Sequence, residues 1–328
     1  MTTAILRQSL YSSFLAGVAV FAAPAVQGQP YPSRPIEFVV HVTPGGGTDV
    51  FARLVTEIMA REKIVTQPLV VVNRPGGSGT IAFTYVKSKR GSPYTVLTMA
   101  TGSFLAATAR TDLDLGLKHF TPLAFFASDP QGVMVNVDSK YKTYKDLIAD
   151  AKANPDAIAC SVASAQGTGR QMLWLVERET GTRFKFVAFT SGSAAVLSVL
   201  GGHVQFSTEN VSEAWAHIEA KKMRVLAVSS EKRMPALPDV PTMLELGSKI
   251  TIGTGRGFVM PAAVPKNDAA AMEALLAKVH KSALWKDYAQ KNMYEERWMG
   301  SAEFARYLEV VTKEQEEFVK AVGTTAKP

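Results

Sequence analysis

Three glycine-rich turns in this sequence could hold an anion. They are Thr43-Pro-Gly-Gly-Gly-Thr-Asp49, Asn73-Arg-Pro-Gly-Gly-Ser-Gly-Thr80 and Ala163-Ser-Ala-Gln-Gly-Thr-Gly-Arg170. Each follows a predicted strand and opens a predicted helix. Backbone N–H groups at a helix N-terminus are unpaired and lie at the positive end of the helix dipole, and glycine lets a ligand approach them closely. A single such turn is also explained as a tight connection capped by Thr48 or Ser78, but three in one chain favour a carboxylate or phosphate site.

The turns differ from nucleotide-binding motifs. The first has no Gly-Lys-Ser/Thr ending, and the second, Gly76-Gly-Ser-Gly-Thr-Ile81, lacks the third glycine of a dinucleotide loop. The chain also has no Gly-x-Ser-x-Gly elbow, no His-Glu-x-x-His motif and no pair of cysteines for a metal. Its five histidines are scattered, which favours structural or surface roles. These observations favour a binding protein without cofactor or metal over an enzyme, and leave an exported α/β hydrolase or transferase as the alternative.

Strand-like and helix-like segments alternate around the turns, which is the rhythm of α/β proteins whose parallel sheets are flanked by helices. The helix predicted over 49–59, for example, places its apolar side chains on one face. After Pro261 the chain is predicted to be helical as far as Val322. The predicted strands are 36–42, 69–72, 94–99, 132–136, 158–162, 184–189, 204–208, 225–229 and 257–260, and the predicted helices are 49–59, 80–86, 144–153, 170–179, 269–282, 284–291 and 301–322.

The N-terminus is typical of an exported protein. Arg7 is the only charged residue before an apolar run from Phe14 to Ala23, and small and polar residues follow as far as Gln29. This pattern predicts a signal peptide over residues 1–28 that is removed on export. The apolar run is about half of the ~20 residues that span a bilayer, and no charge-free apolar stretch of ~18 residues follows it. We therefore expect a soluble periplasmic protein whose mature chain begins between Val26 and Tyr31.

Length, charge and cysteine content limit the possibilities further. The 328 residues are enough for two α/β lobes, since a single core stops growing near ~250–300 residues. The formal net charge is +7, but Lys and Arg are spread along the chain without a long basic block. A nucleic-acid surface is therefore poorly supported, whereas the mild positive charge suits either an anionic ligand or surface solubility. The single Cys160 cannot form an internal disulfide and is predicted to lie in the core.

Several short blocks of residues resemble those of a known family. Each block alone is weak evidence, but together they are specific. The blocks are Tyr31-Pro-Ser-Arg-Pro-Ile36, Pro44-Gly-Gly-Gly-Thr-Asp49, Val72-Asn-Arg-Pro-Gly-Gly77, Asp146 to Asn154 leading to Pro155, Leu200-Gly-Gly-His-Val204, and Leu226-Ala-Val-Ser-Ser230 with Arg233-Met-Pro-Ala-Leu-Pro-Asp-Val-Pro-Thr242. In this order they cover nearly the whole mature chain. The sequence resembles the substrate-binding receptors of tripartite tricarboxylate transporters, also called Bug receptors.

The resemblance implies an α/β fold of the periplasmic binding protein type II class. Such a fold has two lobes, each a mainly parallel sheet flanked by helices, and two crossovers of the chain between them. Lobe one would hold residues 29–127 and 253–328, and lobe two residues 128–252. The implied function is a monomeric receptor that binds a small carboxylate in a cleft between the lobes and delivers it to the membrane permease subunits of the transporter. A receptor that serves a membrane sensor kinase is the alternative.

The resemblance also implies where the ligand binds. The glycine-rich loops of lobe one would hold a ligand carboxylate mainly through backbone groups and water, while lobe two closes over it. The candidate residues are Gly45, Gly46, Gly47, Thr48, Asp49, Gly76, Gly77, Ser78, Gly79 and Ser103 in the first part of the chain, and Gly167, Thr168, Arg170, Ser191, Asn210 and Arg256 further on.

Two of these candidates depart from the family's usual pattern. Arg170 stands where an uncharged residue or histidine is common, and Arg256 where an aromatic residue such as Trp is frequent. Because a guanidinium can hold a carboxylate through two hydrogen bonds, either arginine could bind a second anion. This predicts a dicarboxylate ligand, for example an aromatic diacid. In the alternative interpretation Arg170 only covers a helix face and Arg256 pairs with an acidic neighbour.

Overall fold

The computed structural model describes residues 31–108, 113–189 and 191–322, except for the side chain of Ser78. The predicted signal peptide lies outside the described residues. All structural statements below concern the described part of the chain. No helix in that part combines the length and the apolar composition needed to cross a bilayer.

The sheet of the first lobe has the strand order β2-β1-β3-β9-β4-β10. Strand β1 (Ile36–Val40) pairs in parallel with β2 (Leu69–Asn73) and β3 (Thr95–Ala100), as the alternating pattern predicted. Strand β9 (Gly253–Pro261) runs antiparallel to both β3 and the long β4 (Phe120–Asn136). Strand β10 (Glu295–Gly300) adds to β4, also antiparallel. The sheet is therefore mixed, and its parallel part is the region that carries the first two glycine-rich turns.

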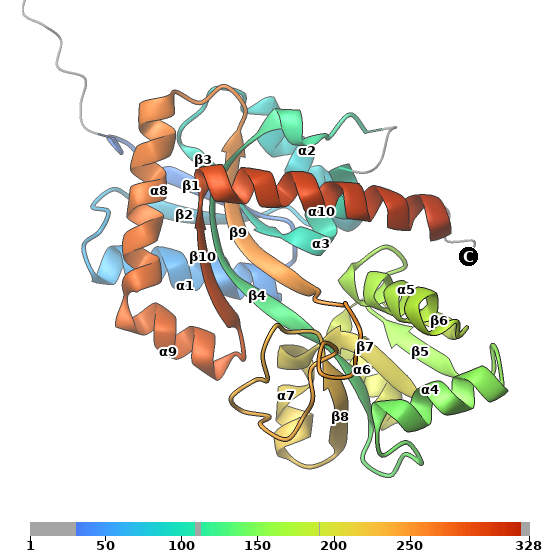
Figure 1. Cartoon of the computed structure of the whole chain (residues 1–328). Coiled ribbons are helices and arrows are strands. Elements are labelled where there is room, and N and C mark those ends of the chain that lie inside the picture. Colours follow the sequence, from blue (N-terminus) through green and yellow to red (C-terminus); the bar gives the residue numbers. More distant parts are fainter. Residues whose placement is uncertain (1–30, 109–112, 190, 323–328) are drawn as a thin grey trace, which may run out of the picture. The chain divides into compact units, whose positions relative to one another are not determined.

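Helices cover both faces of this sheet (Figure 1). Neighbouring strand residues such as Phe258 and Val259 point to opposite faces and join different core clusters. Phe258 packs with Phe51 of α1 and lies in one cluster with Trp285 of α9, whereas Val259 lies with Phe304 of α10 in the other. The helical elements of this lobe are α1 (Gly47–Arg61), η1 (Gly77–Gly79), α2 (Thr80–Ser88), α3 (Thr101–Thr108), η2 (Leu117–His119), α8 (Lys266–Lys281), α9 (Ala283–Lys291) and α10 (Ser301–Val322).

The sheet of the second lobe has the order β8-β4-β7-β5-β6. The two pairs that β5 forms, with β6 and with β7, are parallel, and the pairs with β4 are antiparallel. Cys160 lies buried in β5, as predicted. The strands are β5 (Ala159–Val162), β6 (Lys185–Ala188), β7 (Phe206–Asn210) and β8 (Met223–Val228), and the helices are α4 (Tyr144–Ala153), α5 (Thr168–Thr180), α6 (Gly192–Leu200) and α7 (Val211–Glu219).

Strand β4 belongs to both sheets. Its residues up to Pro130 pair with β9, and its residues from Gln131 onward pair with β7 and β8. The chain returns through β9, so two strands run between the lobes. Strand β4 changes its partners between Pro130 and Gln131, close to the first expected crossover, and the exact lobe boundaries at 128 and 253 stay a proposal. One expectation was wrong: the segment after Pro261 is not helical throughout, because Glu295–Gly300 forms the edge strand β10.

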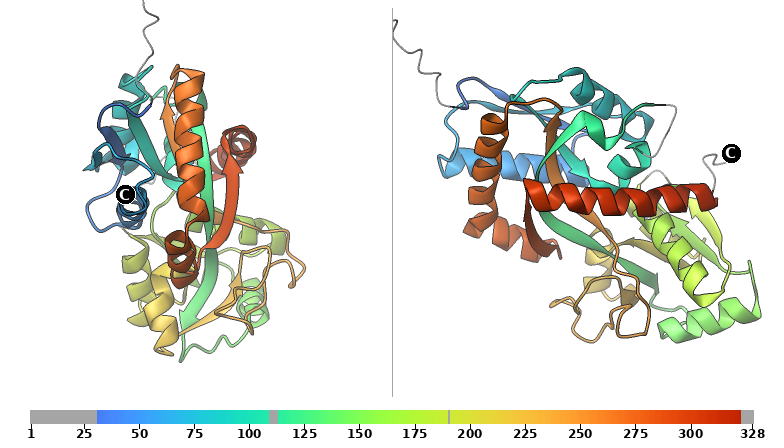
Figure 2. Two further views of the ribbon diagram at one scale, coloured as in Figure 1. Left: turned by 90° about the vertical axis from the view of Figure 1, so that its left-hand side faces the viewer. Right: turned by 45° about the horizontal axis from the view of Figure 1, so that its top comes forward.

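The two faces of the crossing strands carry different chemistry. A side chain at Gly255 would meet Phe125 and Thr101, which lie on the face that α10 covers. The next residue, Arg256, points to the other face and lies beside Gly47 at the start of α1. The right-hand view in Figure 2 shows α10 extending toward α5 of the second lobe, and the two helices are in contact. The α1 face therefore brings Arg256 to the first glycine-rich turn.

Candidate ligand-binding site

The first glycine-rich turn is shaped by Asp49. This buried carboxylate accepts hydrogen bonds from the backbone N–H of Gly45 at 2.8 Å, from Arg53 Nε at 2.9 Å and from Asn73 Nδ2 at 2.8 Å. Burial raises the pKa of Asp49, but these hydrogen bonds outweigh burial and hold that pKa below its ordinary value. Asp49 therefore fixes the loop and keeps its charge, so its oxygens are already engaged inside the protein.

The start of α1 is open and lies beside a guanidinium. Its N-cap, Gly46, provides no side-chain hydrogen bond, and Gly45 and Gly47 are exposed. The Arg256 guanidinium lies beside Gly47, and its Nη1 donates to Thr48 Oγ1 at 3.4 Å. A helix N-terminus with unpaired N–H groups and a buried cation next to it is suited to hold an anion.

The second turn has a backbone that only glycine adopts easily. Gly76, Gly77 and Gly79 have φ values of 122°, 57° and 96°. A side chain at Gly77 would collide with Thr80, and one at Gly79 would meet the ring of Phe83. Gly76 and Gly77 are exposed, so their backbone is accessible, while the side chain of Ser78 lies outside the described residues.

His41 lies behind the second turn and was not predicted as a site residue. The imidazole ring of His41 bounds the space beside Gly79 and packs on the ring of Phe83, with the two centroids 5.5 Å apart. The side chain is buried and Nδ1 has no hydrogen-bond partner among the described residues. Burial, and then the charge of Arg256, lowers the pKa of His41 to about 4, so the ring is neutral at pH 7. Its position at the end of a strand beside a glycine-rich turn is the sequence signal that could have marked it.

Arg256 forms an ion pair with Asp129, a residue that the sequence did not single out. Arg256 Nη2 lies 3.1 Å from Asp129 Oδ2, and both side chains are buried. Ser212 Oγ donates to the same carboxylate at 2.8 Å. Burial raises the pKa of Asp129 to about 6, against the opposing effect of Arg256. The acidic neighbour considered as an alternative for Arg256 is therefore present.

Polar contacts connect this pair to the second lobe. Asn210 Nδ2 donates to the backbone oxygen of Asp129 at 2.6 Å, and Asn210 Oδ1 accepts from Thr254 Oγ1 at 3.1 Å. Thr254 Oγ1 also lies 3.5 Å from Thr168 Oγ1, at the uncapped start of α5 after Gly167. Thr168 in turn fills the space beside Gly102, next to the predicted Ser103 in α3. The structure thus brings Thr48, Asn210, Arg256 and Thr168 into one connected region.

Arg170 and Ser191 have local partners within the second lobe. Arg170 is buried; its Nη1 lies 3.3 Å from Glu177 Oε2, and its guanidinium stacks over the Phe186 ring at 4.6 Å. This arrangement agrees with the alternative interpretation, in which Arg170 covers a helix face. Ser191 is the N-cap of α6, where its Oγ accepts from the backbone N–H of Ala194 at 3.2 Å.

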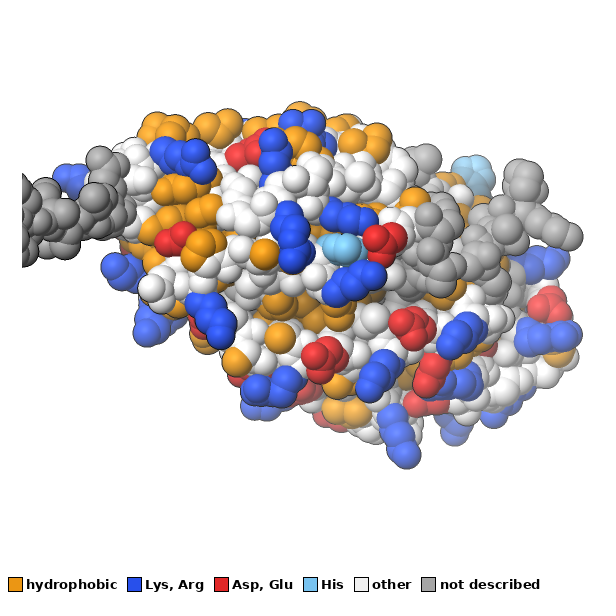
Figure 3. Space-filling model, turned by 90° about the horizontal axis from the view of Figure 1, so that it is seen from above, with side chains coloured by type: hydrophobic (Ala, Val, Ile, Leu, Met, Phe, Trp, Pro, Cys, Tyr) orange, Lys and Arg blue, Asp and Glu red, His pale blue; other side chains and the backbone are white. Residues whose placement is uncertain are grey.

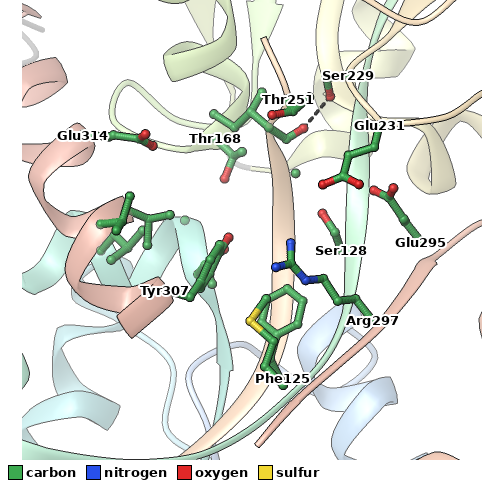
Figure 4. A pocket seen from close by; sticks show the side chains of 18 of the residues that line it. Phe125, Ser128, Thr168, Ser229, Glu231, Thr251, Glu295, Arg297, Tyr307 and Glu314 are labelled. Carbon is green, nitrogen blue, oxygen red and sulfur yellow. Dashed lines mark hydrogen bonds between the residues drawn. The ribbon is translucent and has the colours of Figure 1, made fainter. Parts of the chain in front are cut away.

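A cavity of about 660 Å³ lies on the α10 face of the crossing strands (Figure 4). It is lined by both lobes, with Phe125 and Tyr307 on one side and Thr168 and Ser229 on the other. Arg297 points toward Ser128 inside it, as Figure 4 shows. The two glycine-rich loops of the first lobe do not line this cavity, but Thr168, which lies close to Thr254, does.

Nothing in the described residues points to a metal, since no three His, Cys, Asp or Glu side chains there are arranged to hold one. On the face shown in Figure 3, Lys and Arg side chains are interspersed with acidic and uncharged ones and form no continuous basic block. This face therefore offers an anion no broad positive surface.

Comparison with known proteins identifies the family. The model of the tripartite tricarboxylate transporter family receptor, TctC, matches residues 51–324. The chain belongs to this family. Protein BugT of Bordetella pertussis is 30% identical over 71% of this chain and 73% of its own length. TctC proteins are solute-binding receptors and not enzymes, which agrees with the absence of catalytic motifs from the sequence.

Solved structures of similar proteins confirm the periplasmic binding protein fold. The structure of a TctC solute-binding protein from Polaromonas has a TM-score of 0.76 and 29% identity, and the match covers 89% of this chain and 99% of that one. The structure of an R. palustris protein with adipate has a TM-score of 0.78 and 25% identity over 89% of this chain and 98% of that one. The α/β class and the two-sheet organisation predicted from the sequence are those of a TctC receptor.

Proposed function

We propose that this TctC receptor binds a small carboxylate between its lobes and delivers it to the membrane permease subunits of a tripartite tricarboxylate transporter. The observation that carries the proposal is the open N-terminus of α1. Gly47 exposes its backbone there, the N-cap Gly46 provides no side-chain hydrogen bond, and the guanidinium of Arg256 lies beside Gly47, whereas the N–H groups of Gly45 and Gly46 already donate to Asp49 and Thr43. A carboxylate bound at this point would gain from unpaired N–H groups, the helix dipole and a nearby cation.

The second loop and the second lobe complete the proposed site. The exposed backbone of Gly76 and Gly77 would face the same carboxylate, and Thr168 and Asn210 would contribute polar contacts from the other lobe. Support for a carboxylate comes from the R. palustris relative with adipate. The N-terminal pattern supports export to the periplasm, where such a receptor meets its ligand and its permease.

The expected second carboxylate needs a guanidinium that is free to bind it. Arg256 is paired with Asp129 and Arg170 with Glu177, and both arginines are buried. We therefore propose that the first carboxylate of any ligand is held by the loops, and we assign no arginine to a second one. A dicarboxylate stays a proposal that ligand screening decides.

A thermal-shift screen over mono-, di- and tricarboxylates tests the proposed function. A ligand present at 100 times its dissociation constant adds about 2.7 kcal/mol to the free energy of unfolding, which is a readily measured rise in Tm. We expect at least one small carboxylate to bind stoichiometrically and to remain unchanged. Failure of every carboxylate to raise Tm, or turnover of a bound one, would contradict the proposal.

A substitution at Gly47 tests the loop. Its φ is not in the left-handed region, and a Cβ there would only touch Arg256 at an ordinary distance, so Gly47→Val should fold. The larger side chain would fill the approach to the helix end, and we expect the affinity to fall by roughly tenfold or more, which is about 1.4 kcal/mol. Gly116→Val is the matched control, because Gly116 has a φ of −54° and open space around its Cβ position. Equal affinities in the two variants would remove this loop from the site.

A further inference from the structure

A second cavity, of about 620 Å³, lies between the lobes beside α9. Its walls come from α9 and the segment that follows it in lobe one, and from the segment after β8 in lobe two. Most of its lining is apolar and includes Pro130, Met234, Ala289 and Met293. No described residue of the three glycine-rich turns lines it. The volume lies in the range of about 300–1,000 Å³ that is typical of small-molecule sites.

The crossing strands separate this cavity from the two glycine-rich turns of lobe one. In the sheet order β2-β1-β3-β9-β4-β10, those turns follow β1 and β2, whereas β10 forms the opposite edge. Glu295 and Glu296 at the start of β10 line the cavity, and Pro130 lies on β4. A molecule in the cavity would therefore contact both lobes without entering the proposed carboxylate site.

Met293 forms an apolar wall that joins the two lobes. It follows the C-cap of α9 with a φ of 59°, a left-handed conformation that glycine usually adopts at this position. The backbone N–H of Tyr294 donates to the backbone oxygen of Ala289 at 2.9 Å, which closes the helix end. The Met293 side chain packs against the core cluster of lobe two that contains Met234. Because methionine is flexible and polarisable, this wall can adapt to apolar bodies of different shape.

Cationic side chains lie at the mouth of the cavity. Arg233 is already engaged, because its Nε lies 2.9 Å from Glu245 Oε2. Lys232 and Lys286 also line the cavity; both are exposed, and neither forms an ion pair with a described residue. One lysine comes from each lobe, so a negatively charged group at the mouth would be attracted by both lobes.

The two carboxylates of the lining have partners of their own. Glu295 accepts a hydrogen bond from the backbone N–H of Glu231, and Glu296 Oε1 lies 3.8 Å from His280 Nε2. The charges left without a partner around the cavity are therefore the two lysines. An apolar interior with a cationic mouth is complementary to a molecule that has an apolar body and a negatively charged head.

We infer that this cavity is a second binding site, for a free single-chain amphipathic anion such as a medium-chain alkyl sulfonate or carboxylate. The alkyl chain would occupy the space between Met234 and Met293, and the head would lie near Lys232 and Lys286. Such a site is independent of the carboxylate site of the proposed function, since the glycine-rich turns take no part in it.

Calorimetric titration of the full mature chain with 1-octanesulfonate and with octyltrimethylammonium compares opposite head charges on the same alkyl chain. We expect one octanesulfonate to bind per chain, at least about fivefold more tightly than the cation, because two lysines each contribute on the order of a surface ion pair. Absence of octanesulfonate binding, or equal affinity for the two compounds, overturns the inference.

Two substitutions locate the bound molecule. Ala236 lines the cavity from an exposed loop, so Ala236→Trp should keep the fold, fill the cavity and abolish octanesulfonate binding. Lys286→Gln should weaken octanesulfonate about threefold without weakening the cation. The matched controls are Ala302→Trp and Lys291→Gln, at exposed positions outside the lining, which should bind octanesulfonate as the wild type does. Unchanged binding in Ala236→Trp would contradict the assigned site.

Gly47→Val separates this site from the glycine-rich loops. We expect this variant to bind octanesulfonate with the affinity of the wild type. If Gly47→Val loses octanesulfonate while Ala236→Trp retains it, the anion binds at the start of α1, which overturns this inference and leaves the proposed function standing. Failure of every carboxylate in the thermal-shift screen, with octanesulfonate still bound in Gly47→Val, would have the opposite meaning.

Discussion

Arg256 and Asp129 form a buried ion pair between the two strands that run from one lobe to the other. Arg256 Nη2 lies 3.1 Å from Asp129 Oδ2, with Arg256 on β9 and Asp129 on β4. Arg256 also donates a hydrogen bond to Thr48 at the start of α1, and the backbone oxygen of Asp129 accepts one from Asn210 of lobe two. The pair therefore connects the proposed anion loop to the other lobe, so its loss should affect both stability and the geometry of binding.

Breaking this pair from one side should be strongly destabilising. Asp129→Ala leaves the guanidinium buried without its carboxylate, and an uncompensated buried charge costs about 3–5 kcal/mol. We expect this loss in the free energy of unfolding from urea denaturation. Arg61→Gln, which breaks the exposed pair with Glu57, should cost about 0.5 kcal/mol or less. Similar effects of the two substitutions would show that the pair at the crossing strands contributes little.

Glu209 should make the protein less stable as the pH rises from 6.5 to 8.5. Burial raises its pKa to about 8 from an unfolded value near 4.5, so the folded state holds a proton that the unfolded state has released. As the pH rises toward 8 the folded state also releases this proton, and the free energy of unfolding falls by an amount on the order of 2 kcal/mol between pH 6.5 and 8.5. Asp129, with a pKa of about 6, is largely ionised in both states throughout the window.

Urea denaturation of the wild type and Glu209→Gln at both pH values measures this effect. Gln keeps an acceptor for the N–H of Ala163 but has no proton to lose. The variant should therefore show a flatter dependence of stability on pH. A dependence as steep as that of the wild type would mean that Glu209 is ionised in the folded protein at pH 6.5.

Most helices and strands could be predicted from the sequence, but the polar contacts around Arg256 and Asp129 could not. Alternation of apolar segments predicted the strands and helices around the glycine-rich turns, because one buried face per element leaves a periodic signal. Strand β10 left no such signal, since Glu295 and Glu296 interrupt the apolar pattern of this edge strand. Arg256 and Asp129 are 127 residues apart, and only the antiparallel pairing of β9 with β4 brings them together.

Candidate residues on the loops were easier to predict than their partners. Glycine in a βα turn is recognisable on its own, and Gly47, Gly76 and Gly77 do expose backbone. Whether a helix end is free depends on residues elsewhere in the chain. Glu213 reaches the start of α6 only because α6 and α7 pack together, a contact that no local pattern indicates.

Export should remove the N-terminal segment. The apolar run from Phe14 to Ala23, with small residues after it, predicts cleavage by signal peptidase, and the mature chain should begin between Val26 and Tyr31. N-terminal sequencing and intact mass of the protein released from the periplasm of the native host check this. Recovery of a chain that still begins with Met1 would contradict the prediction.

The C-terminal half of α10 should stabilise the protein by packing on the second lobe. Phe318 is fully buried and lies against Trp174 of α5, with ring centroids 5.6 Å apart, and Gln315 Nε2 donates to the backbone oxygen of Gln166 at 3.2 Å. Truncation of a buried phenylalanine removes apolar contacts and leaves a cavity, so Phe318→Ala should lower the free energy of unfolding by about 3–5 kcal/mol. Val310→Ala is the control on the same helix, because Val310 is 57% exposed and should cost about 0.5 kcal/mol or less. Thermal and urea denaturation of both variants measure the difference. Equal stability of the two variants would show that the end of α10 does not hold α5 in solution, and the contact between Phe318 and Trp174 would then have no part in joining the lobes.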